Sequence, residues 1–180
     1  MADSLATNVR VMLYGTDTHT LDLIASIPAN IAIDFPSVTG QVLATGTGDQ
    51  QADLFWSDSR SCTVSAPDLL DLEGANLHAG YTALTSNFGA TLTFAKVKVL
   101  AIYNKDTTRD LRVGADALHP WFAWCDAATD YMVIPPLGVR LLTAPKAGFA
   151  VTAGTGDLLK IVPSADVATA YDIVIIGTSA

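Results

Sequence analysis

Residues 91–104 read TLTFAKVKVLAIYN, and their pattern is the clearest indication of the fold class. On one parity every second side chain is apolar or aromatic: Ala95, Val97, Val99, Ala101 and Tyr103. The other parity places Lys96 and Lys98 between apolar residues at both ends of the stretch. A repeat of two residues is that of an extended strand, because a helix repeats about every 3.6 residues. We expect one long strand over residues 91–104, at the centre of a sandwich. The second face of this strand is expected to meet different surroundings along its length.

Short apolar runs separated by turn residues follow this strand. Strands are expected over residues 110–113, 121–125, 131–134, 139–143, 149–152, 158–162 and 171–176. Pro135-Pro136-Leu137-Gly138 predicts a turn between two of them, because proline fixes φ and cannot donate to a strand ladder. Even spacing of short strands is typical of a sandwich or barrel. Residues 173–176 are apolar at every position, which predicts a central strand covered on both faces.

The stretch before residue 91 gives weaker signals. Residues 52–60 follow the turn Gly46-Thr47-Gly48-Asp49 and predict a strand that enters from a loop, with a second strand around residues 61–65. Residues 68–74 form either one helical turn or a strand that Gly74 ends. We expect residues 1–50 to hold an N-terminal arm and first strands, packed on or projecting from a β-sandwich domain over residues 51–180.

The composition also favours strands. Of the 18 acidic residues, 17 are Asp and Glu73 is the single Glu, and the chain holds 13 Gly and 8 Pro. Asp bonds locally to backbone and disfavours helices, whereas Glu and Lys usually fill exposed helix faces. Half of the 180 residues are hydrophobic, enough to bury one core. The predicted fold class is all-β, an antiparallel β-sandwich with jelly-roll-like connectivity.

Charge and hydropathy argue against several kinds of partner. The chain has a net charge of −8, with 10 Lys and Arg, so we expect it to bind neither nucleic acid nor an anionic membrane surface. Its uncharged stretches are too short or too polar for a membrane helix, and Met1-Ala2-Asp3-Ser4 lacks the cationic start of a cleaved export signal. We expect Cys62 and Cys125 to be free thiols rather than a disulfide.

Residue types that carry out catalysis are sparse. The three histidines are His19, His78 and His119, and the chain has no Gly-x-Ser-x-Gly elbow. His119 and Cys125 are close enough in the sequence to suggest a thiol–imidazole pair. We expect instead that His119 caps a turn and that Cys125 is a small core residue. Zinc sites commonly use Cys or His at close spacing, which this sequence lacks. We predict no enzyme, no catalytic residue, no cofactor and no metal ligand.

The many aspartates raise the question of calcium, which takes oxygen ligands. Residues 126–130 and the two Gly-Thr-Gly-Asp turns, 46–49 and 154–157, could each supply carboxylates. No Asp-x-Asp-x-Asp loop is present, and Asp in turns more commonly bonds to nearby backbone. The same turns lack the Lys and following helix of a phosphate-binding loop. We therefore expect turn formers here rather than ligands.

The tryptophans leave a carbohydrate platform open as an alternative, since sandwiches can stack sugars on exposed aromatic rings. The chain has Trp56, Trp121 and Trp124. A strand over residues 121–125 would place Trp121 and Trp124 on opposite faces, with at least one of them in the core and the other available for a subunit contact.

Four stretches of the sequence carry a family resemblance: residues 52–60 (ADLFWSDSR), 92–98 (LTFAKVK), 150–160 (AVTAGTGDLLK) and 171–178 (YDIVIIGT). The chain resembles a family of small virion proteins of tailed bacteriophages, whose members are similar in length and accompany the major capsid gene. The family has no catalytic motif, so the resemblance implies no active site. Family members usually have a Pro-Gly-Gly turn where this chain has residues 135–138.

The resemblance implies a structural protein of the virion. We expect a capsid decoration or stabilising protein on the outer surface of the head, assembled in the host cytoplasm. Its expected partners are the major capsid protein and further copies of itself, in a trimer or other symmetric oligomer. Contacts to neighbours are expected from residues 1–30 and from Trp121. A tail, connector or fibre-base protein is the alternative within the virion, and a carbohydrate-binding module for host adsorption is the alternative outside this class.

Overall fold

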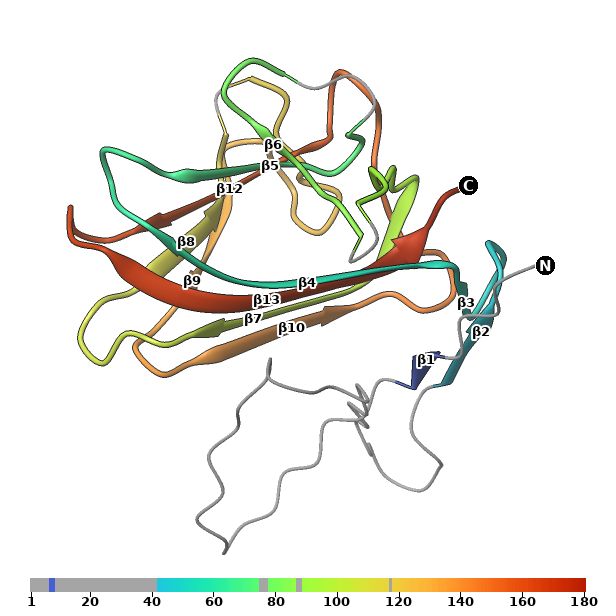
Figure 1. Ribbon diagram of the computed structural model, residues 1–180, viewed down its shortest axis with the longest axis horizontal. Helices are drawn as coiled ribbons and strands as arrows, with labels where there is room; N and C mark the ends of the chain where they lie inside the picture. Colours follow the sequence, from blue (N-terminus) through green and yellow to red (C-terminus); the bar gives the residue numbers. More distant parts are fainter. Residues whose placement is uncertain (1–6, 9–41, 75–77, 87–88, 117) are drawn as a thin grey trace, which may run out of the picture.

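The computed structural model describes residues 7–8, 42–74, 78–86, 89–116 and 118–180 (Figure 1). In these ranges the chain forms strands and turns and no helix, so the all-β prediction is confirmed. Among the described residues there is accordingly no helix with the length and apolarity needed to cross a membrane.

Two five-stranded sheets make up the body of the protein. Sheet I has the order β10-β7-β13-β4, with β11 also paired to β7, and sheet II has the order β6-β5-β12-β8-β9. The strands of sheet I are β4 (Leu54–Cys62), β7 (Lys96–Asn104), β10 (Val139–Thr143), β11 (Phe149–Ala150) and β13 (Thr169–Thr178). The strands of sheet II are β5 (Asp68–Asp71), β6 (Thr82–Ala83), β8 (Leu111–Gly114), β9 (Tyr131–Ile134) and β12 (Leu158–Pro163). All pairs are antiparallel except β5 with β6.

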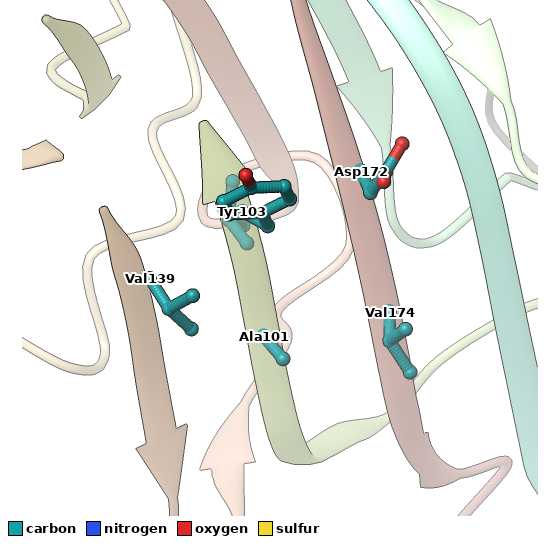
Figure 2. Close-up of a pocket in the computed structure, with 6 residues that line it drawn as sticks. Ala101, Tyr103, Val139, Asp172 and Val174 are labelled. Carbon is teal, nitrogen blue, oxygen red and sulfur yellow. The ribbon is translucent and has the colours of Figure 1, made fainter. Parts of the chain in front are cut away.

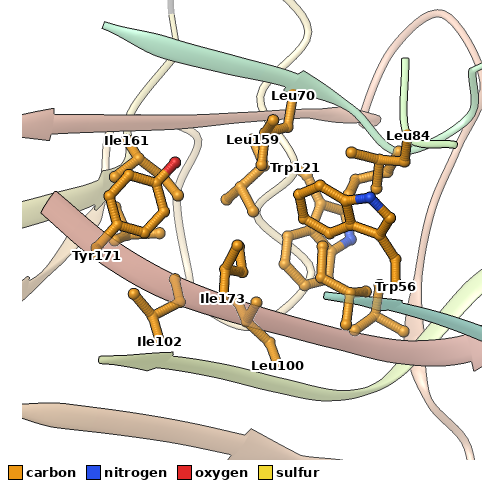
Figure 3. Close-up of a cluster of buried hydrophobic side chains, with 14 of the residues drawn as sticks. Trp56, Leu70, Leu84, Leu100, Ile102, Trp121, Leu159, Ile161, Tyr171 and Ile173 are labelled. Atoms are coloured by element: carbon orange, nitrogen blue, oxygen red, sulfur yellow. The ribbon is translucent and has the colours of Figure 1, made fainter. Parts of the chain in front are cut away.

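The core fills the space between the two sheets (Figure 3). Sheet I contributes Leu100, Ile102 and Ile173, and sheet II contributes Leu159 and Ile161, each no more than 1% exposed. These residues alternate with others along their strands, as a two-layer packing requires. The two-layer β-sandwich predicted from the sequence is therefore confirmed, while the jelly-roll connectivity stays a prediction.

The prediction of a central, doubly covered strand near the C-terminus is also confirmed. β13 lies between β7 and β4, and Ile173 to Ile176 are all buried. Ile173 and Ile175 face the core between the sheets, whereas Val174 and Ile176 belong to a smaller cluster on the outer face of sheet I.

The long strand expected over residues 91–104 is shorter and less regular than predicted. β7 begins at Lys96, and its pairing with β13 shifts at a β-bulge, where Ile176 lies opposite Val99 but Gly177 lies opposite Val97. Lys98 is the extra residue of this bulge. Because a bulge reverses the parity of side chains along a strand, Val97 and Leu100 both reach the inner core.

Two other expected strands are wrong. β4 continues to Cys62 and a turn follows, so no second strand covers residues 61–65. Residues 121–125 form turns, in which Cys125 N–H donates to Phe122 O at 2.9 Å. Of the two alternatives for residues 68–74, the strand is confirmed as β5. It is followed by Gly74 at φ +65°, a left-handed conformation that glycine adopts easily.

A third small sheet joins β1 (Thr7–Asn8), β2 (Val42–Thr45) and β3 (Gln51–Ala52). Leu43 and Ala52 pack into the outer cluster on sheet I, and Gln50 N–H donates to Pro145 O at 2.9 Å. Residues 42–52 are thus attached to the sandwich. The rest of the predicted N-terminal arm lies outside the described residues, so the division at residue 50 stays a prediction.

Candidate functional site

Three polar side chains that are distant in the sequence meet beside the start of β12. His78 lies between β5 and β6, His119 precedes the bridge between Pro120 and Leu158, and Asp157 immediately precedes β12. One possible ligand atom from each of the three lies within 4.8 Å of those from the other two. We call these residues the His–His–Asp cluster.

The geometry of the cluster is close. Nε2 of His78 lies 3.5 Å from Oδ2 of Asp157. The imidazole rings of His78 and His119 meet edge to face, with 4.7 Å between their centroids. The side chain of Asp157 is fully buried and that of His78 is 21% exposed, so the cluster is buried at one end and reaches solvent at the other.

Backbone hydrogen bonds fix the position of Asp157. The N–H groups of Asp157 and Leu158 both donate to His119 O, at 3.2 and 2.9 Å, and Leu72 N–H donates to Asp157 O at 2.9 Å. The carboxylate of Asp157 also accepts a hydrogen bond, because Gly154 N–H donates to Oδ2 at 2.7 Å. Asp157 is therefore rigidly placed between the segments that carry the two histidines.

Three side-chain atoms of the cluster are buried without a hydrogen-bond partner among the described residues: His78 Nε2, His119 Nδ1 and Asp157 Oδ1. Buried polar atoms are nearly always hydrogen-bonded, because leaving one unpaired costs about 1–3 kcal/mol. Three such atoms in one place, of which His78 Nε2 lies 3.5 Å from Asp157 Oδ2, mark the cluster as incompletely hydrogen-bonded.

Asp71 and Glu73 lie next to this cluster and form a second close group with Asp157. Asp71 has a structural role there. Its Oδ1 accepts the N–H groups of Glu73 and Gly74, at 3.0 and 2.8 Å, and its Oδ2 accepts that of His78 at 3.4 Å. The carboxylate of Asp71 thus shapes the turn after β5 and helps to place His78.

His119 and Cys125 do not form a thiol–imidazole pair, because the ring of His119 lies against that of His78. Cys125 Sγ donates to Phe122 O at 3.4 Å and to Ala127 O at 3.6 Å. Burial, followed by the nearby charge of Asp130, raises the pKa of the Cys125 thiol, so it is not an activated thiolate. Both Cys62 and Cys125 are free thiols, as predicted.

The prediction that aspartates serve as turn formers is confirmed at two of the proposed calcium positions. Asp130 Oδ2 accepts the N–H of Ala127 at 3.0 Å, and Asp157 Oδ2 accepts that of Gly154 at 2.7 Å. Asp157 combines this turn with membership of the His–His–Asp cluster, which its sequence motif did not indicate.

No protein-family model matches this sequence, and no curated protein matches it.

The tryptophans are all at least partly buried. Trp121 is 1% exposed and its indole donates to Ala150 O at 2.8 Å, and Trp56 is also buried. Trp124 is half-buried, and its indole donates to Trp121 O at 3.1 Å. The expectation of a core tryptophan is confirmed, whereas the expectation that Trp121 contacts neighbouring subunits is wrong, because its ring is inside the sandwich.

Four of the exposed apolar side chains lie along one side of the sandwich, where both sheets end. Tyr131 and Val133 of β9, Leu137 of the connecting turn and Val139 of β10 are 38% to 54% exposed. We call these four residues the β9–β10 edge. Among the described strands, β9 and β10 each pair on one side only. Arg140 Nε donates to Val133 O at 3.2 Å, so the two edges run close together.

A shallow hollow adjoins this edge on the outer face of sheet I (Figure 2). Ala101, Tyr103, Val139 and Val174 line it, with Asp172 at one end. Asp172 is already occupied, because Ser59 Oγ and Lys105 Nζ donate to its Oδ1 at 2.7 and 3.1 Å. The hollow thus continues the apolar surface of the β9–β10 edge.

Proposed function

We propose that this chain is a non-enzymatic structural protein of a bacteriophage virion, a capsid decoration or stabilising protein on the outer head surface. It associates with further copies of itself and with the major capsid protein. The sequence resemblance to small virion proteins supports this role, and the two-layer all-β sandwich of the described residues is compatible with it.

The main structural support for this proposal is the β9–β10 edge. A strand edge with unpaired backbone groups is a template for pairing with another chain, and soluble proteins usually cover or charge such edges. Here Tyr131, Val133, Leu137 and Val139 are exposed alongside Arg140 of β10, and Arg112 lies over the ring of Tyr131 at 5.4 Å from its centroid. Exposed apolar side chains beside free edges favour a contact repeated between subunits.

The acidic character of the chain fits an outer location. With a net charge of −8, the protein would be repelled by the phosphates of DNA inside a filled capsid. On the outer surface, the same negative charge would keep separate particles apart in solution.

The test combines the oligomeric state of the purified chain with its binding to capsids that lack it. We expect a symmetric oligomer by light scattering and saturable cosedimentation with capsids, at hundreds of copies per particle. Val133→Asp with Val139→Asp should abolish both, because two charges would be placed in the contact. Val167→Asp is the matched control, since Val167 is 46% exposed in the loop between β12 and β13.

Three outcomes would reject the proposal. A monomer that fails to bind stripped capsids would exclude a decoration role. A dozen or fewer copies per particle would instead indicate the tail, connector or fibre-base alternative. Glycan binding without capsid binding would favour the carbohydrate-binding module, for which the partly or fully buried tryptophans offer little platform.

A further inference from the structure

The His–His–Asp cluster leaves a buried negative charge poorly compensated. Asp157 is fully buried, its Oδ2 accepts one N–H bond from Gly154, and its Oδ1 has no partner among the described residues. In the described part of the chain its only ion-pair partner is His78, which carries charge only when protonated. A buried carboxylate without a cation or further hydrogen bonds is costly, so this geometry calls for a positive ligand.

The donor set selects the kind of cation. Two imidazoles and one carboxylate offer two nitrogens and one oxygen, which suit zinc and related first-row transition ions. Calcium and magnesium prefer oxygen ligands throughout. A single proton would join His78 to Asp157 but would leave His119 Nδ1 unpartnered.

The spacing fits such an ion. Zinc bonds to nitrogen and oxygen are about 2.0–2.2 Å long, so two ligands at tetrahedral corners lie about 3.3–3.6 Å apart. Nε2 of His78 and Oδ2 of Asp157 are 3.5 Å apart, and the three ligand atoms lie within 4.8 Å of one another. Small rotations of the histidine side chains would bring all three atoms to bonding distance.

We propose that His78, His119 and Asp157 bind one zinc ion, with the fourth position open to water. His78 and His119 are half-buried, so the site lies near the surface, although Nε2 of His78 and Nδ1 of His119 are themselves buried. Neighbouring groups support the ligands, since Gly154 N–H orients the carboxylate of Asp157 and Asp71 accepts the backbone N–H of His78. The site is independent of a virion role.

Such an ion would join three segments that backbone hydrogen bonds connect only in part. It would link the turn after β5, the connection between β8 and β9, and the start of β12, at one end of sheet II. Metal ions that bridge separated segments stabilise the folded state, because the unfolded chain has no preformed site.

The test uses the full chain, with any affinity tag removed, after dialysis against a chelator and then metal-free buffer. We expect titration with Zn²⁺ to give one ion per chain and a higher melting temperature, and Co²⁺ to give the visible absorption of a four-coordinate ion. Excess Mg²⁺ or Ca²⁺ should not compete. Asp157→Asn and His119→Gln should each weaken zinc binding by about 100-fold or more.

The controls use matched residues. Asp157→Asn keeps an oxygen that can accept Gly154 N–H, so it removes a ligand without removing the turn. His19→Gln and Asp130→Asn remove the same groups elsewhere and should leave the one-to-one stoichiometry intact. In the unmutated chain, zinc should shift the ring resonances of two of the three histidines, a result that does not depend on any variant folding.

Absence of stoichiometric zinc binding in the unmutated chain would overturn the proposal. So would unchanged affinity in folded Asp157→Asn and His119→Gln, or loss of binding in His19→Gln. An imidazolium–carboxylate pair between His78 and Asp157, seen without any zinc-dependent change, would then be the better account of the cluster.

Discussion

Arg60 and Asp68 join the two sheets through a pair of parallel hydrogen bonds from one guanidinium to one carboxylate. Nη2 of Arg60 donates to Oδ1 of Asp68 at 2.8 Å, and Nε donates to Oδ2. Arg60 belongs to β4 of sheet I and Asp68 to β5 of sheet II. The hydroxyl of Tyr171 on β13 also donates to Oδ2 of Asp68. The hydrogen bond to Asp68 raises the pKa of Arg60, and burial, followed by Asp68, raises that of Tyr171.

Breaking this pair should destabilise the sandwich. Arg60→Ala would leave the buried carboxylate of Asp68 with Tyr171 as its remaining side-chain partner, at an expected cost of about 3 kcal/mol in the free energy of unfolding. Urea unfolding followed by tryptophan fluorescence measures this change. The control is Asp58→Asn, because Asp58 also bonds to Arg60, at 2.9 Å, but its side chain is 43% exposed. We expect the control to cost less than about 1 kcal/mol. Equal effects of the two substitutions would contradict the structural role of the buried pair.

Strands bounded by strong turn residues could be predicted from the sequence almost to the residue. β9 and β10 occupy residues 131–134 and 139–143 as expected, since the prolines and Gly138 between them break the pairing on both sides. β13 could be recognised because a run of apolar residues at consecutive positions has no exposed face.

Where tertiary contacts decide, local patterns were misleading. Residues 121–125 are as apolar as a strand, but they form turns. Trp121 packs into the core from there, and its indole N–H donates to Ala150 O. The lysines within residues 91–104 suggest that one face of the strand meets different surroundings along its length. The irregular pattern comes instead from the β-bulge at Lys98. The ammonium of Lys98 donates to Lys146 O at 2.7 Å.

The His–His–Asp cluster had no local signal to find. His78, His119 and Asp157 are separated by dozens of residues, and they meet only because β12 pairs with β5 and its start is bridged to Pro120. A search for closely spaced ligands therefore passes over them. The one sequence feature that touches the cluster is the second Gly-Thr-Gly-Asp turn, which ends at Asp157.

Gly177 should be intolerant of substitution because it lies at the bulge between β13 and β7. A Cβ at this position would lie 2.1 Å from Lys96 O and 2.7 Å from a ring carbon of Phe94. We expect Gly177→Ala to lower the free energy of unfolding by about 3 kcal/mol, since the backbone of β7 cannot move without breaking the ladder. Thermal unfolding measures it.

Gly156→Ala is the matched control for the bulge, because the nearest atoms to a Cβ there are 3.8 Å away. Its effect should stay within about 1 kcal/mol. If both variants melted at the same temperature, the close approach at Gly177 would have no energetic weight.

Cys62 should resist alkylation in the folded protein. Its side chain is buried, and desolvation, followed by the charge of Asp68, raises its pKa to about 11. The reactive thiolate is therefore scarce at pH 8. In a Cys125→Ser background, iodoacetamide should label Cys62 at least about 100-fold more slowly than in the urea-unfolded chain. Labelling at the unfolded rate would mean that the end of β4 opens readily, against the packing described here.

Asp106 should make stability depend on pH in acid. Hydrogen bonds to its carboxylate, first from the N–H of Thr108 and then from Arg109, lower its pKa to about 2. The pKa of an unfolded aspartate is about 3.9, so the unfolded chain takes up this proton first as the pH falls. The contribution of Asp106 is thus complete above about pH 4 and is lost as the pH falls toward 2.

Asp106→Asn should therefore unfold at lower urea concentration than the unmutated chain at pH 6, and the gap should narrow between about pH 4 and pH 2.5. Asp126→Asn, in an exposed turn, controls for the change in net charge. We expect it to show no narrowing gap of this kind. A difference for Asp106→Asn that stayed constant over the whole range would show that its effect comes from the lost turn geometry alone and not from the charge of the carboxylate.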